Sequence, residues 1–132
     1  EIPSTQIERY GVISGDLIDG TNNTYRVTNI LEKPNSHDLI EFVDNRIDLN
    51  NVPSFMAVIG RYILTPDIFD ILKKIKPGKS GEIEITDALL SQVNQGKVIA
   101  YKFKGKRFDC GSVEGYLEAT NHFAKTLGIN NI

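Results

Sequence analysis

The second half of the chain carries repeated helix start and stop signals beside short apolar runs, and this pattern most limits the fold. The signals bracket three segments: Thr65-Pro66-Asp67 to Pro77-Gly78, Thr86-Asp87 to Gly96, and Ser112 to Gly128. A hydroxyl cap, a first-turn proline and an early acid favour a helix start, and glycine favours its end. Apolar runs at 55–64 and 98–103 predict strands. The sequence therefore predicts an α/β protein with a mixed sheet flanked by helices.

The first half predicts a hairpin followed by a less regular region. Residues 9–14 (RYGVIS) and 25–31 are strand-like, and glycine and asparagine between them favour a turn at 15–23. Ser36 is a candidate cap for a short helix at 37–44, and residues 45–53 have the composition of a loop. The run FMAVIGRYIL at 55–64 is short and rich in β-branched and aromatic residues, which predicts a strand buried on both faces.

Length, charge and cysteine content restrict the class of protein. The 132 residues suffice for one domain, and the net charge of -2 argues against nonspecific binding of nucleic acid. No apolar run approaches a membrane span, and no signal peptide is visible. The single cysteine, Cys110, excludes an internal disulfide and a multi-cysteine metal site, so we expect a cytoplasmic setting. The chain begins at Glu1 and has no glycine-rich phosphate loop, which is consistent with a part of a longer protein.

Glu32, Lys33 and Pro34 place a carboxylate beside an ammonium at the end of the second predicted strand. Pro34 disfavours helix at Lys33, so we expect an extended pair whose side chains point to opposite faces. A carboxylate can accept two sugar hydroxyls, while an ammonium can hold a phosphate, and this suggests a sugar phosphate as ligand. The alternative is an exposed strand end with ordinary surface charges, which three residues do not exclude.

Asp109 lies between the last predicted strand and the last predicted helix, in the sequence Asp109-Cys110-Gly111. A carboxylate at such a junction can hold Mg²⁺, which takes one or two protein carboxylates together with substrate oxygens. Equally, Asp109 can cap local backbone donors. Cys110 is expected to be a small buried thiol, because neither histidine of the chain has a third group to orient it as a base. A basic patch precedes Asp109 and is expected to be a solvated face; it comprises Lys102, Lys104, Lys106 and Arg107.

Five short motifs occur in one particular order along the chain. They are Tyr10-Gly11-Val12, Glu32-Lys33-Pro34, Gly60-Arg61-Tyr62, Glu82-Ile83-Glu84-Ile85-Thr86-Asp87-Ala88 and Gly105-Lys106-Arg107-Phe108-Asp109-Cys110-Gly111. Together they resemble the C-terminal half of the bacterial UTP–glucose-1-phosphate uridylyltransferases, within the wider family of sugar-nucleotide pyrophosphorylases. The resemblance covers nearly all of residues 1–132. It implies a single domain that is the C-terminal part of a Rossmann-like nucleotidyltransferase fold, with the nucleotide-binding half absent.

The resemblance also implies roles for individual residues. Glu32 and Gly11 would bind the sugar, Val58 would line the substrate site, and Lys33 would hold the sugar phosphate as a catalytic residue. Asp109 would be the second catalytic residue, as a ligand of a Mg²⁺ cofactor. We therefore expect Glu32, Lys33 and Asp109 to meet in one cleft.

The activity implied by the resemblance is the formation of UDP-glucose and pyrophosphate from UTP and glucose 1-phosphate. The partners would be these small molecules, without nucleic acid or membrane, and family members often form homo-oligomers. Two departures bear on the sugar: Phe55 follows Ser54 where the family commonly has asparagine, and the segment between Pro34 and Ser54 is long. The alternatives are a noncatalytic scaffold or oligomerisation module of the same fold, or a nucleotidyltransferase for another sugar 1-phosphate.

Overall fold

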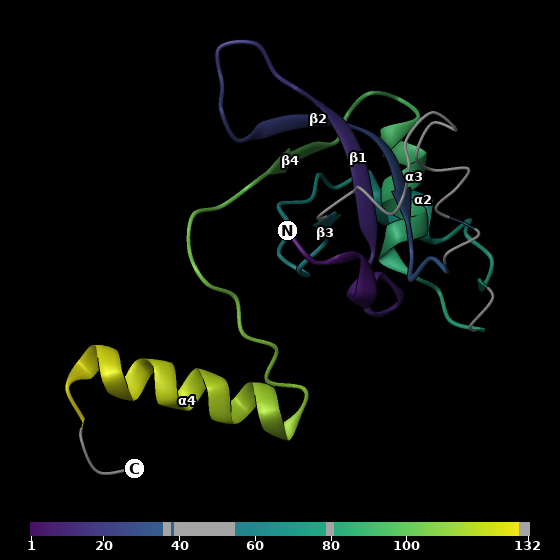
Figure 1. Ribbon diagram of the computed structural model, residues 1–132. Coiled ribbons are helices and arrows are strands. Elements are labelled where there is room, and N and C mark those ends of the chain that lie inside the picture. The colour runs from purple at the N-terminus through teal and green to yellow at the C-terminus, as the bar shows by residue number, and fades with distance from the viewer. Residues whose placement is uncertain (36–37, 39–54, 79–80, 130–132) are drawn as a thin grey trace. The chain divides into compact units, whose positions relative to one another are not determined.

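The computed structural model describes residues 1–35, 38, 55–78 and 81–129, and these form two compact units (Figure 1). The first unit is Glu1–Lys102, and the second is Phe103–Ile132. The α/β class expected from the sequence is confirmed by the combination of a sheet with helices. The expected single-domain organisation stays a prediction. None of the described helices is both long and apolar enough to cross a bilayer.

A four-stranded sheet forms the centre of the first unit, in the order β3-β1-β2-β4 (Figure 1). The strands are β1 (Val12–Leu17), β2 (Thr24–Leu31), β3 (Met56–Ala57) and β4 (Ile99–Tyr101), and each pairing between these described strands is antiparallel. The β1–β2 pairing confirms the predicted hairpin. Strand β1 runs three residues beyond the predicted end, because Gly15 allows a bulge there: a Cβ on Gly15 would lie 2.5 Å from the carbonyl oxygen of Arg26.

Two helices of the first unit supply the apolar side chains that cover the sheet. These are α2 (Ile68–Leu72) and α3 (Ile85–Val93), and a short 3-10 helix, η1 (Ser4–Arg9), precedes β1. The main core joins strand β2 to both helices and contains Val27, Ile30, Ile68, Ala88, Leu89 and Val93. A smaller core forms around the N-terminal segment and contains Ile2, Ile7, Val12 and Phe55. Val27 and Ile30 of β2 thus lie in the main core, and Val12 of β1 lies in the smaller one.

The prediction for residues 55–64 is largely wrong. Only Met56–Ala57 forms a strand, with a single bridge between Phe55 and Ile2, and residues 58–65 are irregular. Ile63 is fully exposed, so the run is not buried on both faces. Apolar composition indicated burial here, but Phe55 alone of this run joins a core as a buried residue. Helix α2 is also shorter than predicted, and the helix expected at 37–44 lies almost entirely outside the described residues.

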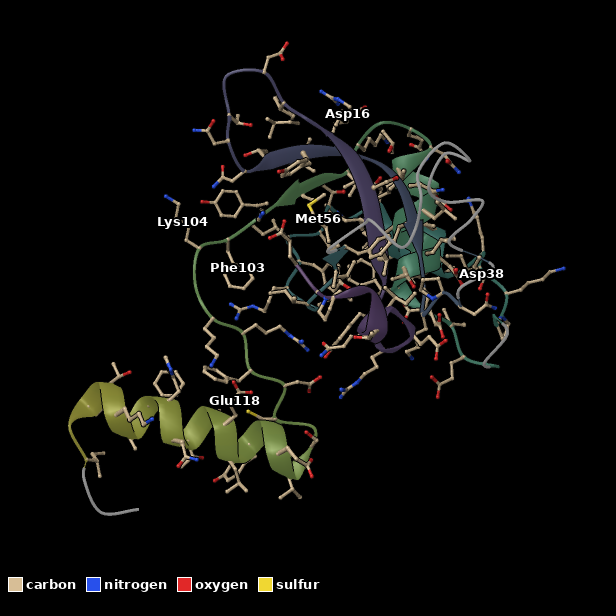
Figure 2. All side chains as sticks on the ribbon, in the orientation of Figure 1. Asp16, Asp38, Met56, Phe103, Lys104 and Glu118 are labelled. Atoms are coloured by element: carbon tan, nitrogen blue, oxygen red, sulfur yellow. The ribbon has the colours of Figure 1, made fainter. Side chains whose placement is uncertain are left out.

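The second unit consists of an extended segment and the helix α4 (Val113–Leu127). Phe103 and Lys104 lie on the extended segment, and Glu118 lies on α4 (Figure 2). The predicted helix bounds are confirmed: the Ser112 hydroxyl accepts a hydrogen bond from the Gly115 N–H at 3.1 Å, and Gly128 ends the helix with φ +70°. Lys106 pairs with Glu118 at 2.8 Å, which ties the segment to its helix.

Candidate functional site

A pocket of about 280 Å³ opens in the first unit and contains four of the residues predicted from the sequence, Gly11, Glu32, Lys33 and Val58. The remaining lining residues come from the loops and helices around the strand ends: Arg9, Tyr10, Gly60, Tyr62, Glu82, Glu84, Ile85 and Thr86. Whether these residues bind substrate stays a prediction, but their common location makes this pocket the candidate site.

Backbone pairing explains why residues far apart in the sequence meet at this pocket. Val12 of β1 is paired with Leu31 of β2. The residues next to them, Gly11 and Glu32, therefore lie side by side at the same end of the two strands. The Lys33 N–H donates to the carbonyl oxygen of Tyr10 at 3.2 Å. On the other side, the Val58 N–H donates to the carbonyl oxygen of Gly11 at 2.8 Å. The hydrogen-bonding pattern of the sheet thus builds one wall of the pocket.

Gly11 leaves space between the side chains at the base of the pocket. A Cβ atom on Gly11 would lie 3.0 Å from Glu32 Oε2, 3.3 Å from Thr86 Cγ2 and 3.5 Å from Val58 Cγ2. The first two separations are tighter than ordinary contacts, so a side chain here would displace its neighbours. Glycine therefore keeps a backbone surface open beside the Glu32 carboxylate.

Lys33 departs from the expected geometry. Its backbone has φ +42°, in the left-handed region, and not the extended conformation that a following proline favours. Its Nζ lies 3.7 Å from Glu32 Oε1, so the two side chains face one another and the prediction of opposite faces is wrong. The reason is tertiary: the Lys33 N–H is bound to Tyr10, and Pro34 is fully buried. These contacts outweigh the local preference, which amounts to about 1 kcal/mol.

Tyr62 and Thr86 also line the pocket, although neither of them was predicted as a site residue from the sequence. Burial raises the pKa of the Tyr62 hydroxyl, and the negative charge of Glu32 raises this pKa further. Tyr62 therefore stays a hydrogen-bond donor at neutral pH. Thr86 is 5% exposed, and among the described residues its buried Oγ1 has no hydrogen-bond partner. The only signal in the sequence was that both residues belong to the quoted motifs.

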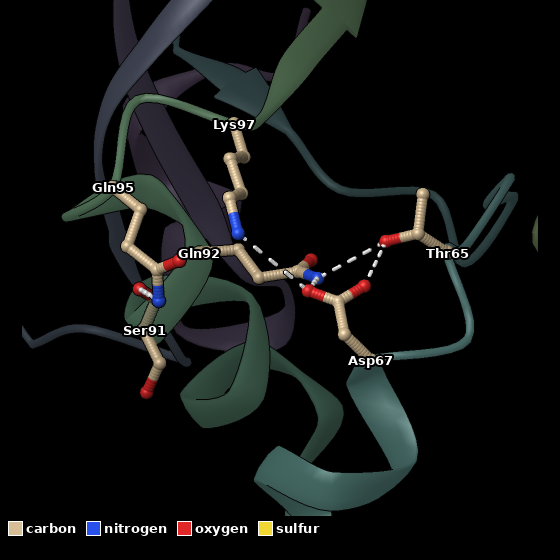
Figure 3. Close-up of polar contacts among 6 residues, drawn as sticks. All are labelled: Thr65, Asp67, Ser91, Gln92, Gln95 and Lys97. Atoms are coloured by element: carbon tan, nitrogen blue, oxygen red, sulfur yellow. Dashed lines mark hydrogen bonds and ion pairs between the residues drawn. The ribbon is translucent and has the colours of Figure 1, made fainter.

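A second polar cluster lies between the start of α2 and the end of α3 (Figure 3). Gln92 Nε2 donates to Thr65 Oγ1 and to Asp67 Oδ2, each at 3.3 Å, and Lys97 Nζ lies 3.8 Å from the same Asp67 oxygen. The Thr65 hydroxyl also donates to Asp67 Oδ1. The Thr65 bond lowers the pKa of Asp67, burial opposes this, and Gln92 and Lys97 add to the lowering. The polar groups of these four side chains pair with one another, so the cluster joins the start of α2 to the end of α3.

Asp109 belongs to the second unit, so its expected meeting with Glu32 and Lys33 stays a prediction. Asp109 Oδ1 accepts the Gly111 N–H at 3.2 Å, and Oδ2 lies 3.2 Å from Arg107 Nη2. A Cβ on Gly115 would lie 1.8 Å from the Asp109 carbonyl oxygen, so the first turn of α4 holds this residue closely. Cys110 is exposed, so the prediction of a buried thiol is wrong.

The chain is similar to proteins of known class. Residues 2–126 match the Nucleotidyl transferase family. A UTP–glucose-1-phosphate uridylyltransferase of Pseudomonas aeruginosa is 51% identical over 127 residues, which are 96% of this chain and 40% of that protein. An enzyme of the same name from Staphylococcus epidermidis is 35% identical over 124 residues, which are 94% of this chain and 38% of that protein.

Two solved structures show the same relationship. A UDP-glucose pyrophosphorylase complexed with UDP-glucose superposes with a TM-score of 0.76 at 48% identity, over 96% of this chain and 42% of that one. A UTP-bound UGPase from Acinetobacter baumannii gives a TM-score of 0.64 at 28% identity, over 93% and 37% of the two chains. This chain therefore spans about two fifths of the length of these relatives.

Proposed function

Since the chain belongs to the nucleotidyl transferase family, we propose that it supplies the sugar-phosphate-binding part of a UTP–glucose-1-phosphate uridylyltransferase. The observation that carries the proposal is the pair formed by Glu32 and Lys33 at the pocket, beside the bare backbone of Gly11. A carboxylate and an ammonium at this separation offer an acceptor for sugar hydroxyls and a cation for the phosphate. The similarity to uridylyltransferases supports the same substrate class.

The reaction we propose is an in-line displacement. A phosphate oxygen of glucose 1-phosphate attacks the α-phosphorus of UTP, a new phosphorus–oxygen bond forms, and the bond to the departing pyrophosphate breaks. Such transfers depend on positioning and on charge neutralisation. In this chain, Glu32 would orient the sugar ring, Lys33 would hold the attacking phosphate, and Gly11 and Val58 would shape the pocket around the sugar. The nucleotide would bind to residues outside this chain.

Nucleotidyl transferases generally use a divalent metal. Asp109 fits the part of one carboxylate ligand, because its side chain is 36% exposed and carries a negative charge beside the backbone of Gly111. Among the described residues there is no cluster of three His, Cys, Asp or Glu side chains, so Asp109 would be joined by substrate oxygens or by other protein groups. We propose Mg²⁺ as the metal; it would neutralise charge on the phosphates.

We further propose that the complete enzyme acts on small-molecule substrates in the cytoplasm and forms a homo-oligomer. We propose neither nucleic acid nor membrane as a partner. The net charge of -2 supports small-molecule substrates over nucleic acid, because nonspecific binding of nucleic acid normally needs a basic surface.

The test is an assay of the complete protein that contains this chain, with UTP, Mg²⁺ and a panel of sugar 1-phosphates. We expect UDP-glucose formation with a preference for glucose 1-phosphate. Lys33→Ala should lower kcat/KM about 100-fold or more, because it removes the cation that holds the phosphate. Lys74→Ala is the matched control, since Lys74 is an exposed lysine outside the pocket. Full activity of Lys33→Ala, or a preference for another sugar phosphate, would contradict the proposal.

A further inference from the structure

The cation at the candidate pocket faces a carboxylate in the structure. Lys33 Nζ lies 3.7 Å from Glu32 Oε1, and the side chain of Lys33 is the more exposed of the two, at 58% against 23%. The backbone favours this arrangement, because Lys33 has φ +42° and its N–H donates to the carbonyl oxygen of Tyr10. Neighbouring side chains of an extended strand would point to opposite faces instead. The fold therefore holds the carboxylate against the ammonium.

The charge of the pocket lining acts in the same direction. Three acidic and two basic residues line the pocket, namely Glu32, Glu82, Glu84, Arg9 and Lys33. The lining thus carries one more negative than positive charge at neutral pH. An anion that approaches Lys33 also approaches Glu32, and like charges at such short range repel each other. Inorganic phosphate must therefore compete with Glu32 for the ammonium.

The two oxygens of Glu32 serve different parts of the pocket. Oε1 lies near Lys33, while Oε2 lies 3.0 Å from the place where a Cβ on Gly11 would be. A ligand on the bare backbone of Gly11 can therefore reach Oε2 with its hydroxyls and Lys33 with its phosphate. Hydroxyls donate to a carboxylate, whereas the negative charge of a bare phosphate repels it. Only a ligand with both kinds of group compensates Glu32 for the loss of the ion pair.

We infer that Glu32 is a specificity-determining residue that excludes bare anions, such as inorganic phosphate, from Lys33. This inference rests on the proposed function, since it takes Lys33 as the cation that holds the sugar phosphate. Discrimination of this kind uses an unfavourable contact with the wrong ligand as well as a favourable contact with the right one. The left-handed backbone of Lys33 contributes to the selectivity, because it brings the ammonium to the carboxylate.

The test measures the binding of inorganic phosphate at Lys33 in the complete protein that contains this chain. Lysines labelled with ¹³C at Cε give NMR signals that shift when an anion binds, and the signal absent from Lys33→Arg identifies Lys33. The remaining lysine signals report whether each variant is folded. We expect Glu32→Gln to bind inorganic phosphate about tenfold more tightly than the wild type, because the repelling charge is gone. This difference should shrink in concentrated NaCl, since salt screens exposed charges.

Asp19→Asn is the matched control for the change in net charge. Asp19 is exposed in the turn between β1 and β2, outside the pocket. Its substitution should leave the affinity for inorganic phosphate at Lys33 within about twofold of the wild type, because a distant exposed charge is screened. Equal phosphate affinities of the wild type and Glu32→Gln would overturn the inference. A gain in Asp19→Asn as large as that in Glu32→Gln would also overturn it.

Glucose 1-phosphate separates this inference from the proposed function. The wild type should bind glucose 1-phosphate more tightly than inorganic phosphate, and Glu32→Gln should lose at least about tenfold of this preference. An undiminished preference in Glu32→Gln would overturn the inference. Failure of glucose 1-phosphate to shift the Lys33 signal of the wild type would instead contradict the proposed function, while the two phosphate affinities still decide whether Glu32 excludes anions.

Discussion

Lys33 Nζ lies 3.7 Å from Glu32 Oε1, while the backbone of Lys33 is held at φ +42°. The Lys33 side chain is 58% exposed, and an ion pair of this kind contributes at most about 1 kcal/mol. A left-handed backbone at a residue with a side chain costs about as much. The ion pair with Glu32 therefore gives no net gain in stability that would explain the left-handed backbone of Lys33. The bond to Tyr10 and the burial of Pro34 hold this conformation, and a strained residue at a pocket supports the proposal that Lys33 binds a ligand.

The first prediction concerns this strain. Lys33→Gly should have a free energy of unfolding about 1 kcal/mol higher than that of Lys33→Ala, because glycine adopts a positive φ without steric cost. Both variants lose the ammonium, so alanine is the matched control for the charge. Urea denaturation of the 132-residue chain measures the difference. An alanine variant as stable as the glycine variant would show that the backbone of Lys33 is not strained.

The second prediction concerns Tyr62. Glu32→Gln should lower the pKa of the Tyr62 hydroxyl relative to the wild type, because it removes the negative charge that opposes ionisation. The pKa should still lie above that of an exposed tyrosine, since burial is the larger cause. Ultraviolet difference titration measures the shift, and Tyr62→Phe identifies the signal among the other tyrosines. An unchanged pKa of Tyr62 in Glu32→Gln would show that the charge of Glu32 does not act on the Tyr62 hydroxyl.

The third prediction is a pH dependence of stability at the cluster of Thr65, Asp67, Gln92 and Lys97. The pKa of Asp67 is lowered in the folded state, first of all by the Thr65 hydroxyl. Stability from this ionisation is therefore present above the unfolded pKa of about 4 and is lost as the pH falls through the lower folded value. Thr65→Val should destabilise the protein at pH values near 7 and have a smaller effect in acid, as measured by urea denaturation at each pH.

Asp67→Asn provides the control for this pH dependence. In a protein that already carries Asp67→Asn, the effect of Thr65→Val should be independent of pH, because the titrating group is gone. A pH dependence that persists in the double variant would assign it to another group.

The fourth prediction concerns Gly115 and Asp109. Gly115→Ala should destabilise the second unit, although alanine is intrinsically favoured over glycine in a helix by about 1 kcal/mol. The reason is that its Cβ would lie 1.8 Å from the Asp109 carbonyl oxygen, a separation that forces the backbone of Asp109 to move. Circular dichroism of α4 during thermal denaturation measures the loss. Asn121→Ala, at an exposed position of the same helix, should be neutral or stabilising.

Movement of Asp109 should also weaken metal binding if this carboxylate is a ligand. We expect Gly115→Ala to raise the Mg²⁺ concentration required for half-maximal activity of the complete protein, and Asn121→Ala to leave it unchanged. Binding of Mn²⁺ followed by electron paramagnetic resonance checks the same point without an activity assay. An unaltered metal affinity in Gly115→Ala would contradict the proposal that Asp109 is a metal ligand.

Local signals were sufficient where the structure depends on neighbours in the sequence. Ser112 and Gly128 bracket α4 as predicted, because a cap acts within one turn of the helix. The hairpin of β1 and β2 follows from strand patterns on either side of a turn. The short motifs also contain Gly11, Glu32 and Lys33, which meet at the pocket.

Other features depended on contacts between distant segments, which no local pattern encodes. Residues 55–64 have the composition of a buried strand, yet most of them find no neighbouring strand among the described residues. Proline favours an extended Lys33, but the bond to Tyr10 and the burial of Pro34 rotate it towards Glu32. Thr86 resembled a simple helix cap, and the packing of α3 beside Gly11 instead gave it a buried, unpaired hydroxyl. Pairing and burial are properties of the folded chain, so these features emerged with the packing of the first unit.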